Sequence, residues 1–253
     1  MVSDLLTYAG VCFSHGAEPV LTDIDIQMPD VGITALAGPS GSGKSTLLRL
    51  ANRLLLPDAG VVSYRSDDVA AMHPPTLRRR LGMVFQRPTP FPGTVRENLS
   101  VAAPELSDTH ARGLMERVNL DPALLGRTAA DLSGGELNRM CLARALATEP
   151  EALLMDEPTA ALDPPARIAL ERLARELADS GIPLVWVTHD LDQLRRVADR
   201  VVLLMDGRVR FAGSLSQLDA AARADPATAR FLADADSSAS PAGEASPTRG
   251  DGT

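Results

Sequence analysis

The 253-residue sequence predicts an α/β protein in which helices cover both faces of a mainly parallel sheet. Three observations support this fold class. Four short runs are continuously apolar, as strands buried on both faces are, and they span 33–37, 152–155, 184–187 and 201–205. Segments with apolar residues at i, i+3, i+4 and i+7 lie between or after these runs. The first 30 residues instead alternate, which predicts a small antiparallel β-subdomain at the N-terminus.

The individual elements follow from their periodicity and their end signals. In residues 22–28, Ile24, Ile26 and Met28 share one face of a strand and the residues between them are polar. Helical spacing covers 47–54, 111–118, 137–146 and 170–177. Ser107 or Asp108 can cap the second of these helices, and Pro164 suits the first turn of the last. Asp206-Gly207 predicts a hairpin turn between two strands.

Two further regions define the domain organisation. Residues 87–130 have helical patterns and no convincing strand, so we expect an inserted helical subdomain over about 87–150. From residue 235 the composition is dominated by Ser, Ala, Pro, Gly and Asp, which cannot bury enough apolar area to order the chain. We therefore expect one domain over 1–234 and a disordered tail over 235–253.

The charge balance excludes several functions. Lys and Arg total 25 and Asp and Glu total 33, so the net charge is −8. This argues against nucleic-acid binding and against a polybasic membrane anchor, since both depend on clustered basic side chains. Cys12 and Cys141 have no metal-ligand spacing. The N-terminus does not resemble a signal peptide, and no apolar run approaches the ~20 residues that span a bilayer. We expect a cytoplasmic protein.

A glycine-rich loop follows the buried strand 33–37 and precedes the helix that runs to residue 54. Residues 38–45, GPSGSGKS, match the phosphate-binding pattern G-x-x-x-x-G-K-[ST]. Lys44 is expected to reach the β- and γ-phosphates and Ser45 to ligate Mg²⁺. The expected nucleotide-binding residues are Gly38, Pro39, Ser40, Gly41, Ser42, Gly43, Lys44, Ser45 and Thr46. A surface loop rich in Gly and Ser is the alternative, but the flanking strand and helix disfavour it.

Two carboxylates follow the apolar strand 152–155. Asp156 at such a strand end holds Mg²⁺ in ATPases with this phosphate loop, and Glu157 can accept a proton from the attacking water. Alone, the pair can equally be solvated residues before a proline. Together with the phosphate loop, they predict an ATP-hydrolysing site.

Residues 132–136, LSGGE, form a second candidate anion site. The hydroxyl of Ser133 and the amides of Gly134 and Gly135 stand at the start of a helix. An ordinary Ser N-cap with a glycine turn also explains the segment. One nucleotide does not need two phosphate-binding helix starts from the same chain.

Taken together, the motifs GPSGSGKST, MVFQ, LSGGE, LLMDEP, ALDP and WVTHD resemble those of the ATP-binding subunit of bacterial ABC transporters. Their order and spacing match over residues 1 to about 215. The resemblance implies a P-loop NTPase (RecA-like) core, ATP and Mg²⁺ as ligands, and ATP hydrolysis. It also implies a head-to-tail homodimer, or a heterodimer with a related ATPase, with two shared ATP sites. The subunit would lie on the cytoplasmic face of the membrane, bound to an integral membrane permease.

The resemblance assigns roles to further residues. Ser133 and Gly135 would contact the γ-phosphate held by the other subunit. Gln86 would touch the Mg²⁺ or the attacking water and sense the membrane partner. His189 would donate a hydrogen bond to the γ-phosphate. Without the family match, Gln86 could be an ordinary exposed residue and His189 an ordinary strand-end histidine.

Two assignments have strong competitors, and the motifs depart from the family at two positions. Asp163 resembles the aspartate that links the two ATP sites, but it can equally cap a helix. Phe13 lies where the family stacks an aromatic ring on adenine, with Tyr8 as the rival that we expect in the core.

Glu136 replaces a commoner Gln, and Ala160 replaces a commoner Ser. Neither removes a group that hydrolysis needs, so we expect an active enzyme.

The transport function and its cargo depend on the resemblance alone. A soluble ABC-type ATPase of repair, translation or cluster assembly is the alternative. Such proteins usually add a second cassette, a coiled coil or basic surfaces, and this chain shows none. A GTPase would need an NKxD-like segment, which is missing. Residues 94–99 resemble the segment near the permease, and residues 83–92 resemble phosphate-import ATPases. The compact size and the VWVTHD motif also resemble metal-efflux ATPases.

Overall fold

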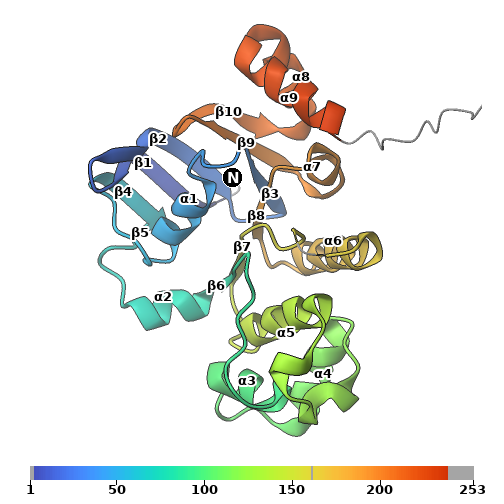
Figure 1. The fold of residues 1–253 in the computed structure, drawn as a ribbon. Helices are drawn as coiled ribbons and strands as arrows, with labels where there is room; N and C mark the ends of the chain where they lie inside the picture. The colour runs from blue at the N-terminus through green and yellow to red at the C-terminus, as the bar shows by residue number, and fades with distance from the viewer. Residues whose placement is uncertain (1–2, 161, 239–253) are drawn as a thin grey trace, which may run out of the picture.

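A computed structural model describes residues 3–160 and 162–238 of the chain (Figure 1). Its strands form two sheets. The N-terminal sheet has the order β2-β1-β4-β5 and is antiparallel, as the alternation predicted. Its strands are β1 (Asp4–His15), β2 (Glu18–Pro29), β4 (Ala59–Tyr64) and β5 (Asp67–Asp68).

The larger sheet has the order β10-β9-β3-β8-β7-β6. Its strands are β3 (Ile33–Ala37), β6 (Leu81–Val84), β7 (Ala152–Met155), β8 (Leu184–Thr188), β9 (Arg200–Met205) and β10 (Arg208–Ser214). The pairs among β9, β3, β8, β7 and β6 are parallel, and β10 is antiparallel to β9. Every residue of β3, β7 and β8 is buried, as the continuous apolar runs predicted. The predicted α/β fold class is confirmed.

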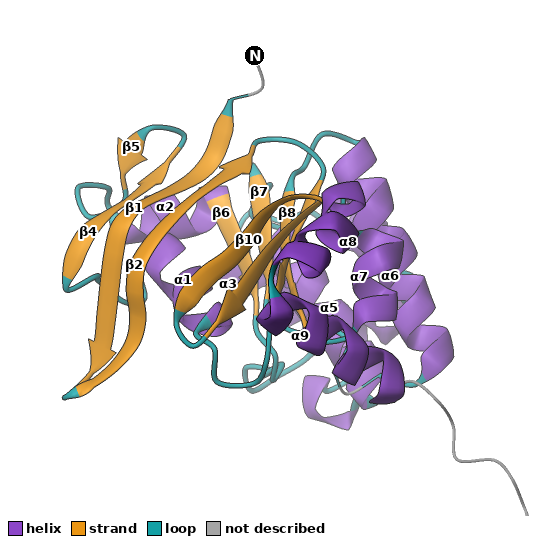
Figure 2. Cartoon of the chain, turned by 90° about the horizontal axis from the view of Figure 1, so that it is seen from above, coloured by secondary structure: helices purple, strands orange, loops and turns teal. Residues whose placement is uncertain are grey.

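The two faces of the larger sheet pack against different layers (Figure 2). In β8, Val185 and Val187 point toward α1 (Lys44–Ala51), which lies between the two sheets. Trp186 points the other way, toward α6 (Pro164–Asp179). The remaining helices of this part are α2 (Pro74–Arg80), α7 (Leu191–Val197), α8 (Leu215–Ala224) and α9 (Pro226–Ser238). Because successive residues of a central strand pack against helices on opposite faces of the sheet, these strands have no polar face.

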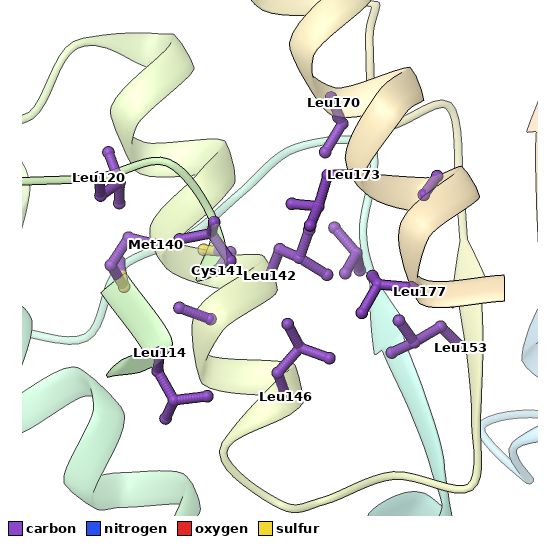
Figure 3. Close-up of a cluster of buried hydrophobic side chains, with 14 of the residues drawn as sticks. Leu114, Leu120, Met140, Cys141, Leu142, Leu146, Leu153, Leu170, Leu173 and Leu177 are labelled. Atoms are coloured by element: carbon purple, nitrogen blue, oxygen red, sulfur yellow. The ribbon is translucent and has the colours of Figure 1, made fainter. Parts of the chain in front are cut away.

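A helical lobe follows β6 in the chain and forms the lower part of Figure 1. It contains α3 (Val95–Ala102), α4 (Asp108–Arg117), two short 3-10 turns (Pro122–Gly126 and Ala129–Asp131) and α5 (Gly134–Leu146). The side chain of Ser107, rather than Asp108, caps α4 by accepting a hydrogen bond from the His110 amide. Leucines of α4, α5, α6 and β7 share one apolar cluster (Figure 3), so the lobe is packed onto the α/β core.

Two boundaries differ from the sequence expectation. The first helix ends at Ala51, not residue 54, because Arg53 adopts a positive φ of 55°. At the C-terminus α9 continues to Ser238, so residues 235–238 of the predicted disordered tail are helical. The rest of that tail, 239–253, lies outside the described residues. Within the described ranges, none of the helices is both long and apolar enough to cross a bilayer.

Candidate active site

The glycine-rich loop connects β3 to α1 at the carboxyl end of the sheet. Gly38 has a φ of 143°, and a Cβ there would lie 1.9 Å from the carbonyl oxygen of Leu204. Only glycine therefore fits where the loop passes β9. Gly43, at the N-cap of α1, offers no side-chain acceptor, and the first turn holds no acidic residue. The first amides of α1 are thus left to bind an anion.

Lys44 lies under this loop. Its Nζ donates hydrogen bonds to the carbonyl oxygens of Gly38, at 2.8 Å, and Pro39, at 2.7 Å. Burial lowers the pKa of Lys44, while the nearby charges of Glu157 and Asp156 act in the opposite direction. The amine is therefore held beside the loop that would cradle phosphate oxygens.

An oxygen-rich pair lies next to Lys44. Ser45 Oγ donates a hydrogen bond of 2.7 Å to Asp156 Oδ1, and Asp156 is 2% exposed. Burial raises the pKa of Asp156, although the Ser45 hydrogen bond partly opposes the shift. A hydroxyl and a carboxylate are hard oxygen ligands, and phosphate oxygens and water would complete an octahedral Mg²⁺ site. The donor set therefore fits Mg²⁺.

Glu157 brings two other predicted residues together. Its Oε2 accepts a hydrogen bond of 2.9 Å from Gln86 Nε2, and its Oε1 lies 3.5 Å from His189 Nδ1. The three residues follow β6, β7 and β8, which are neighbouring parallel strands, so their carboxyl ends meet. Glu157 has a positive φ of 44°, which is uncommon outside glycine and marks a locally strained backbone.

These groups face one cleft of about 540 Å³. Its lining residues are His15, Val20, Ser40, Gly41, Gly43, Lys44, Ser45, Thr46, Gln86, Glu157 and His189. The structure thus gathers most of the predicted phosphate loop and the three residues assigned to the reacting phosphate. Of the expected nucleotide and Mg²⁺ ligands near this loop, Gly38, Pro39, Ser42 and Asp156 do not line the cleft, although Asp156 is hydrogen-bonded to Ser45. A phosphate loop beside a carboxylate pair can bind a nucleotide and activate water.

The structure does not place Phe13, the residue expected to stack on adenine, at the cleft. Phe13 is only 7% exposed and packs in the core between the N-terminal sheet and α1. His15, the exposed last residue of β1, is the ring at the cleft, and Phe13 supports it edge-to-face at 5.1 Å. Tyr8 is buried as expected, and its hydroxyl donates to the Leu47 carbonyl oxygen. The position of His15 at the tip of an alternating strand is the signal that sequence reasoning missed.

The residues assigned to the partner's nucleotide lie away from this cleft. Ser133 caps α5 by accepting from the Glu136 amide, while its own amide donates to the Glu136 carboxylate at 2.8 Å. Neither Gly134 nor Gly135 lines the cleft. Asp163 caps α6 by accepting from the Ala166 amide at 2.8 Å. In the single chain Ser133 and Asp163 act as helix caps.

Comparison with known proteins identifies the family. A family model described as ABC transporter matches residues 21–160. Protein STAR1 of Oryza sativa is 40% identical over 220 residues, which are 85% of this chain and 63% of that protein. The chain thus spans less than two thirds of STAR1. A phosphate import ATP-binding protein, PstB 2 of Aliivibrio fischeri, is 40% identical over 218 residues, 79% of each chain.

Two solved structures of ABC transporter proteins have the same fold as this chain. The cbiO1 subunit of the cbiONQ ABC transporter complex of Clostridium perfringens superposes with a TM-score of 0.78 at 25% identity, covering 93% of this chain and 99% of that one. A bacterial Atm1-family ABC exporter with ATP bound gives 0.82 at 26% identity, covering 96% of this chain and 43% of that one. The cleft, the fold and these relatives show that the chain belongs to the ATP-hydrolysing, ATP-binding subunits of ABC transporters.

Proposed function

We propose that this chain binds MgATP in the cleft between the phosphate loop and His189, and that hydrolysis there drives a solute through a separate membrane permease. The observation that carries the proposal is the convergence, in one cleft, of Lys44, Ser45 and the Gln86–Glu157–His189 group, with Asp156 hydrogen-bonded to Ser45 at its edge. Each of these has a distinct task in the transfer of the γ-phosphoryl group to water.

The phosphate loop and Lys44 would hold the β- and γ-phosphates, and Ser45, Asp156 and Gln86 would hold the Mg²⁺. When bound, this ion neutralises charge on the phosphate oxygens. Glu157 accepts the proton of the attacking water, and His189 donates a hydrogen bond to the γ-phosphate. Because little covalent chemistry falls to the protein, its contribution is positioning and electrostatic stabilisation.

The second half of the ATP site is proposed to come from another copy of this chain or from a related ATPase. Ser133 and Gly134 are exposed at the start of α5, where the first-turn amides can bind an anion. Since the cleft of the same chain does not include them, a head-to-tail dimer would bring them to the γ-phosphate of the partner. Asp163, at the start of α6, would then lie between the two sites.

The permease is proposed to dock in a groove between β6 and the helical lobe. Phe85, Phe91 and Val101 line this groove and are 44%, 47% and 59% exposed. Arg144 lies over the ring of Phe91 at 4.7 Å, which adds a cation to an apolar surface. Phe85 directly precedes Gln86, so docking there would reach the active site. In this proposal the chain lies at the cytoplasmic face of the membrane.

Phosphate is the cargo to test first, because two relatives that are 40% identical carry the name phosphate import ATP-binding protein. The membrane protein that co-purifies with the chain is reconstituted with it in vesicles, and ATP-dependent movement of labelled phosphate is measured. Movement that needs ATP supports phosphate as cargo; transport of a metal ion instead would leave the ATPase role intact and exclude phosphate.

A docking variant tests the groove. Val101→Glu should release the membrane protein and leave ATP binding unchanged, because burying a carboxylate in an apolar interface costs free energy. Val31→Glu is the matched control, since Val31 is 55% exposed and lies outside the groove. Equal release by both variants would place the permease elsewhere.

A further inference from the structure

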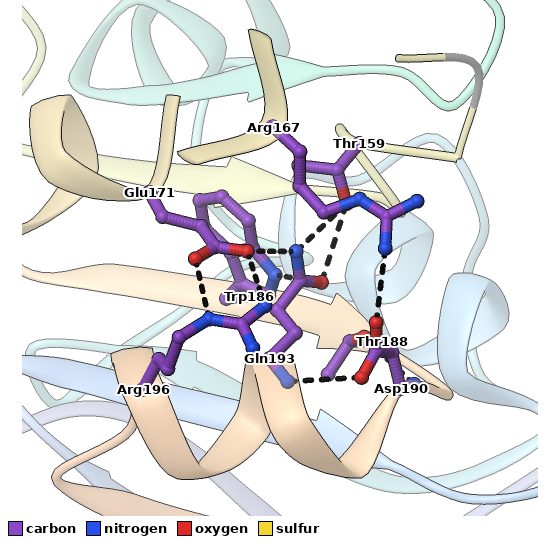
Figure 4. A network of polar contacts seen from close by, with 8 residues as sticks. All are labelled: Thr159, Arg167, Glu171, Trp186, Thr188, Asp190, Gln193 and Arg196. Carbon is purple, nitrogen blue, oxygen red and sulfur yellow. Dashed lines mark hydrogen bonds and ion pairs between the residues drawn. The ribbon is translucent and has the colours of Figure 1, made fainter. Parts of the chain in front are cut away.

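A buried polar cluster joins α6, α7 and β8 to the segment after β7 (Figure 4). Its centre is the side chain of Gln193 in α7, which is only 2% exposed. The groups around it come from three other elements: Glu171 of α6, Trp186 of β8 and Thr159 of the loop after β7. Buried polar groups are costly unless hydrogen-bonded, so such a cluster fixes the geometry of its members.

The amide of Gln193 is fully used. Its Nε2 donates hydrogen bonds of 2.9 Å to Glu171 Oε1 and to Thr159 Oγ1. Its Oε1 accepts one of 3.1 Å from Trp186 Nε1 and a longer one of 3.3 Å from Thr159 Oγ1. An indole N–H can only donate and an ionised carboxylate can only accept, so the amide has a single satisfied orientation.

Glu171 is held in its charged form. Burial acts to raise the pKa of Glu171, but hydrogen bonds from Arg196 and Gln193 outweigh burial and hold the pKa below its usual range. Arg196 Nε and Nη2 donate to the two carboxylate oxygens at 2.8 and 2.9 Å. The carboxylate is therefore a fixed acceptor for Gln193, and nucleotide binding and hydrolysis as described above do not use it.

The same glutamine also reaches the histidine loop through its backbone. The backbone N–H of Gln193 donates a hydrogen bond of 2.9 Å to Asp190 Oδ1, and through this bond Asp190 caps α7. Asp190 directly follows His189 in the chain. Asp190 Oδ2 lies 3.2 Å from Arg167 Nη1 of α6. Thr159, at the other side of the cluster, is two residues after Glu157. Gln193 thus links both catalytic loops to α6.

We propose that Gln193, held by Glu171, is a positioning residue that sets the separation of Glu157 and His189 and thereby the rate of hydrolysis. The proposal rests on the proposed roles of Glu157 and His189. A polar cavity of about 130 Å³, lined by Glu157, His189, Thr159 and Gln193 among others, lies between the cluster and the catalytic groups. Because a misplacement of about 1 Å can cost on the order of 100-fold in rate, the effect falls on turnover and not on nucleotide binding.

The first test compares Gln193→Met with a matched control. Methionine has a similar volume and makes none of these side-chain hydrogen bonds. We expect kcat for ATP hydrolysis to fall by at least about 10-fold, while the Kd for MgATP stays within about 2-fold. Glu151→Gln is the control, because Glu151 accepts from Arg65 and Arg80 in a comparable ion-pair cluster that does not line the cleft. Each protein is assayed at the same interval below its own Tm.

A second pair of variants keeps the proposal testable if Gln193→Met does not fold. Thr159→Val removes only the hydroxyl and should lower kcat, whereas Thr159→Ser keeps the hydroxyl and should restore it. Emission from Trp186, the single tryptophan, checks that the cluster remains folded.

Three results would overturn the proposal: a Thr159→Val variant as active as wild type, a loss in Gln193→Met no larger than in the control, or a Kd that weakens in parallel with kcat. A Glu157→Gln protein with normal turnover would instead remove the proposed base, whatever the Gln193 variants do. The two failures are therefore distinguishable.

Discussion

Glu157→Gln should separate ATP binding from ATP hydrolysis. The substitution keeps the shape of the side chain, and the amide oxygen can still accept the hydrogen bond from Gln86 Nε2 that is 2.9 Å in the wild type. The Ser45–Asp156 pair and Lys44 are untouched, so MgATP should bind with nearly unchanged affinity. What is lost is a carboxylate that can take a proton from water.

The size of the effect follows from this single loss. Removing a positioned general base typically costs 10²–10⁴-fold in rate, which corresponds to about 3–5 kcal/mol in the activation barrier. We therefore expect kcat to fall by that factor with the Kd for MgATP within about 2-fold of wild type. Single-turnover hydrolysis and equilibrium nucleotide binding measure the two quantities separately.

The intact nucleotide should also stabilise a dimer. With the γ-phosphate in place, the α5 N-terminus of a second copy remains engaged, and the neutral side chain reduces repulsion against the triphosphate. Size-exclusion chromatography should show a monomer without nucleotide and a dimer with MgATP.

Adding Ser133→Arg to Glu157→Gln should abolish the dimer, because a bulky side chain then occupies the nucleotide interface. Ser107→Arg is the matched control, since Ser107 is also an exposed helix cap of the helical lobe. Near wild-type turnover in Glu157→Gln would refute the base role. A dimer that survives Ser133→Arg would refute the shared site.

Three more outcomes are expected. His15→Ala should weaken ATP binding by about 1–3 kcal/mol if the ring stacks on adenine, whereas Phe13→Ala should lower the free energy of unfolding by about 3–5 kcal/mol; binding titrations and denaturant unfolding distinguish the two. Because burial raises the pKa of Asp156, its Mg²⁺-binding charged form is lost at a higher pH than for an ordinary aspartate. The affinity for MgATP should therefore fall as the pH is lowered toward that raised pKa, and calorimetry at several pH values should show no such dependence in Asp156→Asn. Deleting residues 239–253, which contain no large apolar side chain, should leave the Tm and the ATPase rate unchanged.

Local patterns were sufficient to predict much of this protein from its sequence. The five residues of β3 are continuously apolar and all buried, and the phosphate loop follows them directly. The carboxylates after β7 and the serine cap of α5 were also identified from neighbouring residues. These features depend on interactions within a few residues, so periodicity and motif spacing define them.

Tertiary structure decided which side chains point into the cleft. Phe13 and His15 are both aromatic residues near the end of β1, and motif spacing favoured Phe13, which does not line the cleft. Register shifts beside Val11 and Phe13 and the end of the strand place Phe13 in the core and His15 at the cleft. Bulges and strand ends depend on the neighbouring strands, which local sequence does not specify.

The Glu171–Gln193 cluster was hidden for the same reason. In the sequence, Glu171 is one of several charged residues on an amphipathic helix, and nothing nearby distinguishes it from an exposed one. It becomes a buried anchor only because α6 and α7 pack side by side against β8, where Gln193 and Arg196 can donate to it. The sequence by itself determined the elements and the phosphate-binding chemistry. Tertiary packing decided which polar groups from distant segments meet, since the cost of burying them is offset only by partners that the fold brings together.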